Sequence, residues 1–382
     1  MTLPTPPQPL TFPALTFAKL APRPFLTAHL TSPSGPLRPS GRLPSQPRAP
    51  TCNAGSLTHA NGSAVVRCGD TAAVCGVRAE ILKVDDVAGY EGREVEDGGD
   101  EDGDEDGEED EEERRSEERE PKRRRNDRDD LARLMLLVPN IELATGCSPA
   151  HLPGGPPSVL AQTLTQRVMR LLLTGDMIGL EPLRIWFRPT EGAAGATGDE
   201  RIGGDGGEME ARRAGDEDGI AKAEVKAFWV LYIDVLFISL DGNAFDAAWF
   251  AILAALRDTL LPRAWWDADR EMVLCSDEVA EAGRLVVRDV LVPLSFGVFE
   301  GEGMGVGEEG REEGKGRWVL VDMDGFEEGL CREEGTVVVG EGGRVVRIEK
   351  SGGLGVGVGE MTGLVELAVK RREEWMRVLG ML

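Results

Sequence analysis

Cysteine and histidine side chains are the first candidates for metal binding or nucleophilic chemistry in this chain. The six cysteines lie far apart in the sequence, and none belongs to a Cys-x-x-Cys pair. The histidines His29, His59 and His151 are equally scattered, and no serine or cysteine beside them indicates a catalytic triad. Because zinc sites and disulfide frameworks need such residues at close, regular spacing, the sequence predicts neither a metal site nor a bound cofactor.

A glycine-rich run at 353–359 is the second candidate. It stands between an expected strand and the last expected helix, where a glycine loop can bind the pyrophosphate of a dinucleotide. That chemistry needs the spacing Gly-x-Gly-x-x-Gly, and Val358 stands where the third glycine is required. The run is therefore interpreted as a loop that joins a strand to a helix.

Hydrophobic periodicity and turn residues predict the elements that would position any site. Asn61-Gly62 between two alternating runs is a strong hairpin signal. The run 227–240 is almost continuously apolar and is predicted to be a strand buried on both faces. Asn243 is expected to cap a helix that extends to Leu261, with Asp246 in its first turn and Pro262 as its stop. The other predicted strands are 52–58, 63–68, 71–82, 183–187, 286–292, 294–299, 318–322, 336–339 and 345–349, and the other predicted helices are 156–178 and 362–379.

This order of elements indicates an α+β fold built of two pseudo-duplicated β-sheet/helix halves. We expect an N-terminal proline-rich arm at 1–48, helical only in pieces because Pro22 and Pro24 interrupt it. The domain at 49–382 is predicted to divide into halves at 49–261 and 262–382. Long acidic insertions, predicted to be disordered, interrupt it at 88–130, 190–222 and 300–316.

The net charge of −25 is concentrated in these insertions. Residues 91–120 alone carry a net charge of −15, so the body of the chain is nearly neutral, and a nucleic-acid partner is not excluded. The basic run 122–125 fits either a nuclear import signal or local charge balance. No apolar run is long enough to span a membrane, and the first residues lack the pattern of a secretory signal, so we expect an intracellular, soluble protein without a membrane partner.

Several short stretches, taken in order, resemble the RNase PH-like family. The similar stretches lie at 37–42, 55–57, 61–64, 68–71, 233–236, 241–243, 318–322 and 327–328. Residues 19–26 and 147–157 are similar to one branch of the family, the ring subunits of the eukaryotic RNA exosome. The resemblance implies the RNase PH-like fold and a ring shared with other RNase PH-like subunits. It also implies RNA-binding cap subunits, an associated processive exoribonuclease and single-stranded RNA as partners, with a location in the nucleus, nucleolus and cytoplasm.

The resemblance also implies where chemistry would occur. Active members use a Gly-Gly-Thr-Arg-Thr loop to bind phosphate, and here Phe245 stands in place of the arginine while Asp246 adds a carboxylate. Asp322 matches the first of two family aspartates, and Glu328 replaces the second. This pair could bind a metal or relay a proton, but a solvated strand end is the favoured interpretation.

These degenerate positions predict a non-catalytic ring subunit of the RNA exosome. It would scaffold 3′–5′ RNA degradation and processing, including ribosomal RNA maturation, by forming part of the channel that threads RNA. An active phosphate-dependent 3′–5′ exoribonuclease is the alternative. A third hypothesis is an acidic factor that binds basic proteins such as histones or ribosomal proteins. Candidates for RNA backbone contact, each of which could equally form a structural ion pair, are Arg38, Arg42, Arg67, Arg78 and Arg167.

Overall fold

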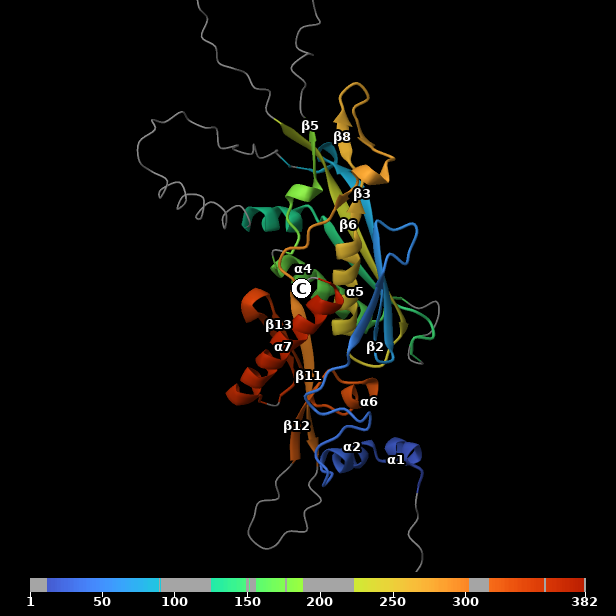
Figure 1. The fold of residues 1–382 in the computed structure, drawn as a ribbon, viewed down its shortest axis with the longest axis vertical. Helices are drawn as coiled ribbons and strands as arrows, with labels where there is room; N and C mark the ends of the chain where they lie inside the picture. The colour runs from blue at the N-terminus through green and yellow to red at the C-terminus, as the bar shows by residue number, and fades with distance from the viewer. Residues whose placement is uncertain are drawn as a thin grey trace, which may run out of the picture.

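The structure is a computed structural model that describes residues 12–88, 90, 125–148, 151, 156–175, 177–187, 223–301, 316–353 and 355–380. Two antiparallel-rich sheets follow each other along the long axis of the molecule (Figure 1). Each sheet is packed against a long helix, so the predicted α+β class with two β-sheet/helix halves is confirmed.

The first sheet has six strands in the order β1-β2-β3-β6-β4, with β5 also paired to β6. All neighbours are antiparallel except β4 and β6, which run parallel. The predicted hairpin that contains Asn61-Gly62 is confirmed by the antiparallel pairing of β1 with β2, and β2 pairs in turn with β3. The strands are β1 (Pro50–Ala54), β2 (Gly62–Cys68), β3 (Thr71–Lys83), β4 (Leu137–Leu143), β5 (Arg184–Phe187) and β6 (Glu224–Ser239).

The second sheet is four-stranded, antiparallel and ordered β12-β11-β13-β14. Where two strands were predicted at 286–292 and 294–299, a single strand begins at Val292, and the residues before it form only an isolated bridge at Val287. The strands are β11 (Val292–Gly301), β12 (Gly316–Val321), β13 (Glu333–Val339) and β14 (Val345–Ser351). Two short pairs complete the described strands: β7 (Leu260–Leu261) with β10 (Gly283–Arg284), and β8 (Ala264–Asp267) with β9 (Met272–Cys275).

The helix α5 (Ala244–Asp258) lies at the centre of the molecule and contacts β1, β2, β3 and β11. Its alanine-rich sequence lets it pack closely, and every residue from Ala244 to Leu256 is buried. It ends at Asp258, earlier than predicted, because Leu260 and Leu261 pair with β10 ahead of Pro262. A central helix that contacts both sheets places its N-terminus at their junction.

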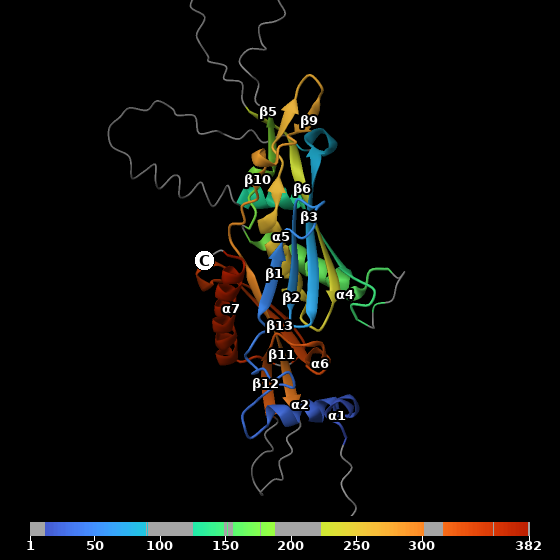
Figure 2. The ribbon, with the colours of Figure 1, turned by 45° about the vertical axis from the view of Figure 1, so that its right-hand side comes forward.

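The remaining helices cover the outside of this arrangement. Ser158 caps α4 (Val159–Thr174) by accepting from the backbone N–H of Ala161, and α4 contacts β4. Figure 2 shows α7 (Val358–Val378) beside β1 and the second sheet. It begins inside the glycine run, four residues before the predicted start. Residues 125–133 are also helical, so the first acidic insertion ends before 125 and not at 130 as predicted.

The proline-rich arm packs on the second sheet. As predicted, it is helical in two pieces, α1 (Ala14–Leu20) and α2 (Pro22–Leu30), but only Pro22 lies at the break, because Pro24 belongs to the first turn of α2. Leu26 and Leu30 of α2 form a buried cluster with Phe299 and Leu320. Arg23 donates to the carbonyl oxygens of Glu300 and Leu330 at 2.7 and 3.1 Å, and so attaches the arm to β11 and its neighbours.

The predicted burial of 227–240 on both faces is wrong, because β6 turns Asp234, Leu236 and Ile238 towards solvent. Most of the three predicted insertions lies outside the described residues; Gly301 and Gly316, however, belong to β11 and β12. The division at 261/262 stays a prediction. No helix in the described part of the chain is long and apolar enough to cross a membrane.

Candidate functional site

The loop between β6 and α5 brings the predicted phosphate-loop residues to the junction of the two sheets. Gly242 and Asn243 both have positive φ, +69° and +49°, so the chain turns sharply before the helix begins. A Cβ atom on Gly242 would lie 2.5 Å from the carbonyl carbon of Asp324, which leaves room only for glycine. The loop thus rests on the start of α6 (Gly325–Glu328), which follows β12.

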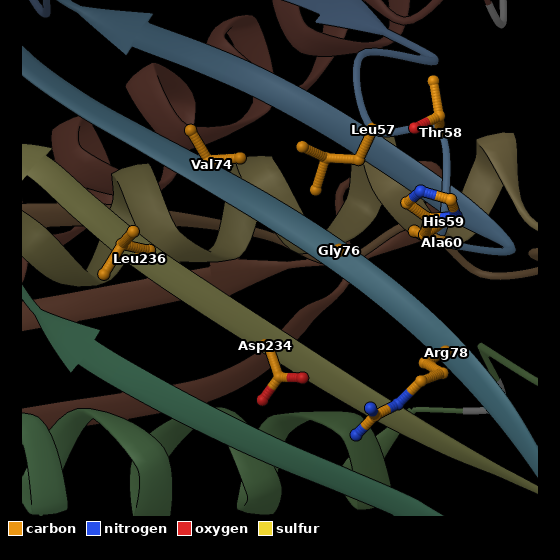
Figure 3. Close-up of a pocket in the computed structure, with 9 residues that line it drawn as sticks. All are labelled: Leu57, Thr58, His59, Ala60, Val74, Gly76, Arg78, Asp234 and Leu236. Atoms are coloured by element: carbon orange, nitrogen blue, oxygen red, sulfur yellow. The ribbon is translucent and has the colours of Figure 1, made fainter.

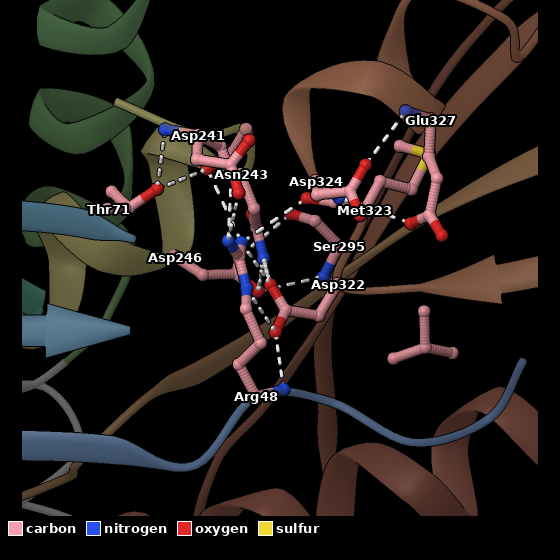
Figure 4. Close-up of polar contacts among 12 residues, drawn as sticks. Arg48, Thr71, Asp241, Asn243, Asp246, Ser295, Asp322, Met323, Asp324 and Glu327 are labelled. Atoms are coloured by element: carbon pink, nitrogen blue, oxygen red, sulfur yellow. Dashed lines mark hydrogen bonds and ion pairs between the residues drawn. The ribbon is translucent and has the colours of Figure 1, made fainter. Parts of the chain in front are cut away.

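Asn243 occupies the N-cap position of α5, but its side chain does not cap the helix. Its amide nitrogen donates to Asp246 at 2.9 Å and also to Asp322 (Figure 4). The predicted capping hydrogen bond is therefore wrong. Asn243 has a left-handed backbone conformation instead of the extended one typical of an N-cap, its Nδ2 is bound to two carboxylates, and its Oδ1 accepts no hydrogen bond from the helix. The backbone N–H of Asn243 donates instead to Oε1 of Glu328 at 2.5 Å.

Asp246 is fully enclosed, with only 1% of its surface exposed. It accepts hydrogen bonds from the hydroxyl of Ser295 at 2.7 Å and from the backbone N–H of Ser295 at 3.1 Å. The buried guanidinium of Arg371, on α7, lies 3.3 Å from the same carboxylate. Asp246 therefore joins α5, β11 and α7, and its charge is compensated from within the chain.

Asp322 is equally enclosed and is held by Arg48 (Figure 4). Its carboxylate accepts from the backbone N–H of Arg48 at 2.6 Å and from Nε and Nη2 of the guanidinium at 3.1 and 2.9 Å. Burial alone would raise the pKa of Asp322, but Arg371 and Arg48 hold it well below its usual range. The prediction of a solvated strand end is wrong for Asp322, because its carboxylate is buried in a bidentate ion pair with Arg48.

Glu328 has a different environment. Burial raises its pKa to about 7, the hydrogen bond from the N–H of Asn243 opposes the rise, and the nearby Glu334 adds to it. Its side chain lines a cavity between α4, the start of α5 and the second sheet, and Asp322 does not line this cavity. The two members of the predicted acidic pair therefore lie in different environments: Asp322 is buried in an ion pair, and Glu328 faces the cavity.

The cavity has a volume of about 640 Å³ and mixed charge. Arg167 of α4 lies 3.8 Å above the centre of the Phe245 ring, donates to Glu349 at 2.8 Å and donates to Thr336 at 2.9 Å. Arg347 is in turn 2.7 Å from Glu349. At this wall of the cavity, the ring of Phe245 stands in the position of the family's phosphate-binding arginine, and the neighbouring Arg167 and Arg347 are paired with Glu349.

The five arginines predicted to contact RNA fall into three environments. Arg38 is 1% exposed and pairs with the buried Glu327 at 3.1 Å, so it holds α6 in place and is not available to RNA. Arg42 is largely covered and donates to the carbonyl oxygen of Asp322 at 2.9 Å. Arg67 and Arg78 are exposed, and Arg167 lines the cavity. RNA contact by the last three stays a prediction.

Arg48 and Arg371 complete the site but were not singled out from the sequence. Arg48 lies at the end of the proline-rich arm, and its partner Asp322 is 274 residues away. Arg371 lies on a mixed-charge stretch of the last helix, where neighbouring residues are also basic. No local pattern marks either side chain, because their partners belong to distant elements.

Among the described residues, no group of three or more histidine, cysteine or carboxylate side chains gathers. The six cysteines are all free thiols. Nδ1 of His29 lies 2.9 Å from the carbonyl oxygen of Phe25, which places this histidine in a local helix contact. The site is therefore best described as an ionic junction beside a cavity.

Comparison with known proteins connects this geometry to a family. The chain is 27% identical to exosome complex component rrp43 of Schizosaccharomyces pombe over 344 residues, which cover 90% of each protein. It is 26% identical to exosome complex component Rrp42 of Methanopyrus kandleri over 327 residues, which cover 85% of this chain and 84% of the relative.

Solved structures share the fold. The structure titled as the Archaeoglobus fulgidus exosome with RNA bound to the active site has a TM-score of 0.55 at 21% identity and covers 92% of this chain and 97% of its own. An archaeal exosome core has a TM-score of 0.53 at 18% identity, with coverages of 93% and 95%. The description "3′ exoribonuclease family, domain 1", that of RNase PH, matches residues 46–98 and 114–262. These residues make up more than half of the chain, and so the chain belongs to the RNase PH family of 3′ exoribonucleases.

Proposed function

We propose that the protein is a non-catalytic ring subunit of an RNA exosome core. In this role it forms part of the wall of a channel that threads single-stranded RNA to a separate processive exoribonuclease, and it supports RNA degradation and ribosomal RNA maturation. Two relatives that the chain matches over most of their length are named exosome complex components, and these names support this assignment. Its partners are other RNase PH-like ring subunits and RNA-binding cap subunits, in the nucleus, the nucleolus and the cytoplasm.

The observation that carries the non-catalytic role is the internal pairing of the site. Phosphorolysis needs a free cation to bind phosphate and free acidic groups to assist the transfer. Here Phe245 replaces the expected arginine, Arg371 neutralises Asp246, and Arg48 neutralises Asp322. Three cations that line the cavity, Arg167, Arg347 and Lys350, are paired with Glu349 or Glu333, so phosphate there would compete with carboxylates of the chain itself.

Two measurements test the proposal. Affinity purification of the tagged chain with mass spectrometry should recover a stoichiometric complex of several RNase PH-fold proteins, whereas recovery of the chain alone would contradict the ring assignment. The purified chain, incubated with single-stranded RNA, phosphate and magnesium, should release no nucleoside diphosphate above background. Phosphate-dependent release that Glu328→Gln abolishes would support the alternative, an active exoribonuclease, because that variant keeps an acceptor for the N–H of Asn243.

A further inference from the structure

The cavity beside the start of α5, called the junction cavity below, separates its charges by sign. Strands β13 and β14 form one wall, and their register places Glu334 opposite Ser351 and Val338 opposite Arg347. Glu334 and Val338 are four residues apart, which is about 13 Å along a strand. The wall therefore has an acidic end at Glu334 and a basic end at Arg347.

The acidic end holds two carboxylates without a counterion. Among the described residues, Glu328 accepts a hydrogen bond only from the backbone N–H of Asn243, at 2.5 Å, and no lysine or arginine nitrogen lies within 4.0 Å of Glu328 or Glu334. Asn243 also lines the cavity and is 5% exposed, and its Oδ1 has no hydrogen-bond partner in the described part of the chain. This end thus offers carboxylate and amide oxygens to a positively charged group.

The basic end has a surplus of positive charge. Arg167 and Arg347 share one carboxylate, that of Glu349, at 2.8 and 2.7 Å. Arg170 lines the cavity one helical turn beyond Arg167, and no carboxylate of the described residues lies within 4.0 Å of its guanidinium. Three guanidinium groups therefore face one carboxylate, and an anionic group would find unpaired donors here.

The direction of α4 places Arg170 at this basic end. The C-cap residue Gly175 lies against Leu291, where a Cβ atom would come within 2.7 Å of Cδ1. Strand β11 begins at the next residue, and it pairs there with the end of β13. Arg170 stands between Arg167 and Gly175 on α4, so it lies on the side away from Glu334.

A second hollow, of about 460 Å³, differs in this respect (Figure 3). It lies on the outer face of the first sheet, and its lining is largely aliphatic, with Leu57, Val74 and Leu236. It has one carboxylate, that of Asp234, and one guanidinium, that of Arg78, so its opposite charges balance. The separation of charge is a property of the junction cavity.

We propose that the junction cavity binds a zwitterionic ligand in which an aliphatic stem joins a carboxylate to a cation of the lysine or arginine type. The cation lies between Glu328 and Glu334, the stem packs on Leu240 and Met323, and the carboxylate meets Arg170. A free basic amino acid and a polypeptide that ends in lysine or arginine both carry this chemistry. The volume of about 640 Å³ is usual for a small-ligand site. The site is independent of the ring function, because all its residues belong to this chain.

Charge favours this ligand over two others. The phosphates of RNA would find cations at one end of the cavity and two carboxylates at the other. A polyamine would satisfy Glu328 and Glu334 but would bring further positive charge towards Arg170, and like charges at close range repel. A zwitterion of matching direction satisfies both ends.

Saturation-transfer NMR on the purified full-length chain tests the proposal. Nα-acetyl-lysine, Nα-acetyl-arginine and the two free amino acids carry both charges, whereas the acetylated amides lack the carboxylate and Nα-acetyl-norleucine lacks the cation. We expect at least one probe with both charges to bind with a Kd of about 1 mM or lower, and the probes with one charge to bind at least about ten-fold more weakly.

The same titrations distinguish the two sources of the ligand. Tighter binding of an acetylated amino acid indicates the end of a polypeptide, because its α-nitrogen is uncharged, and tighter binding of a free amino acid indicates a free metabolite. The absence of binding by every probe with both charges would overturn the proposal. Equal binding of a probe that lacks one charge would overturn it as well, because one end of the cavity would then play no part.

Variants at the two ends give a second readout. Arg170→Gln and Glu334→Gln should each weaken binding at least about ten-fold, and both side chains are exposed, so the variants should keep the wild-type melting temperature. Arg67→Gln and Glu80→Gln remove the same charges from the first sheet, where the side chains are 66% and 53% exposed, and should change the affinity less than about two-fold. Wild-type affinity in either cavity variant, or equal losses in the controls, would overturn the proposal.

Discussion

Replacing Asp322 by asparagine separates a structural role of this carboxylate from a catalytic one. The substitution removes one charge from a pair that is almost completely buried, and it turns an acceptor for the Arg48 N–H groups into an amide that can accept with one oxygen only. Removing one partner of a buried ion pair costs about 3–5 kcal/mol, because the other charge stays enclosed and uncompensated. We therefore expect Asp322→Asn to lose a large part of the stability of the domain.

The assay is thermal and urea unfolding of the purified chain, compared with a matched surface variant. Glu360→Gln removes the ion pair between Glu360 and Arg317, at 3.0 Å, whose side chains are 35% and 31% exposed. Partly exposed pairs of this kind contribute about 0–1 kcal/mol, so the control should unfold almost as the wild type does. A cycle of Arg48→Met, Asp322→Leu and the double variant should show that the double variant loses less stability than the two single variants combined.

The pH dependence supplies a second check on the same pair. Because the folded state lowers the pKa of Asp322, its contribution to stability is present above the unfolded pKa of about 4 and is lost as the pH falls towards the folded value. The deficit of Asp322→Asn should therefore be complete at neutral pH and shrink below about pH 4. Carboxylates held ready for catalysis are often destabilising, so an Asp322→Asn protein as stable as wild type at pH 7 would refute the structural assignment.

Three further predictions concern other parts of the molecule. The folded state raises the pKa of Glu328 to about 7, so its contribution to stability is present below about pH 4.5 and is lost as the pH rises through 7. In urea unfolding, the stability of Glu328→Gln relative to wild type should therefore increase by about 2 kcal/mol between pH 5.5 and pH 8. An equal dependence of stability on pH in the two proteins would contradict this. Leu26 lies on the buried face of the arm, and Leu26→Ala should lower the free energy of unfolding by about 2–5 kcal/mol. Leu15 is 81% exposed, and Leu15→Ala should change the free energy of unfolding by less than about 0.5 kcal/mol. Equal losses in the two variants would show that the arm does not pack on the second sheet. Gly242→Ala should lower the melting temperature because its φ is +69° and its new methyl group meets the backbone of α6, and an unchanged melting temperature would contradict this close approach.

Local sequence signals predicted most of the elements well. The hairpin that contains Asn61-Gly62, the helix α4, the broken helix of the arm and the long final helix all depend on neighbours within a few residues. Errors arose where a distant element decided the outcome. The end of α5 is set by the pairing of Leu260–Leu261 with β10, and the start of β11 is set by its register with β13, so neither could be read from nearby residues.

The candidate site followed the same rule. The resemblance to the family directed attention to Phe245, Asp246, Asp322 and Glu328, and the structure brings all four to one junction. The interpretation of Asp322 as solvated failed because a sequence does not show that Arg48 and Arg371 approach it from the arm and from the last helix. For Arg38 the sequence left RNA contact and a structural ion pair equally open, and the structure shows the ion pair with Glu327.

By itself, the sequence determined the composition of this protein and most of its local structure: a nearly neutral body with acidic insertions, many of the strands and helices, and a phosphate loop without its arginine. Only the tertiary structure decided which charges neutralise one another, which face of β6 remains open, and which of the two acidic positions reaches the cavity. The physical reason is that propensity and capping act over a few residues, whereas burial and ion pairing depend on elements that meet across hundreds of residues.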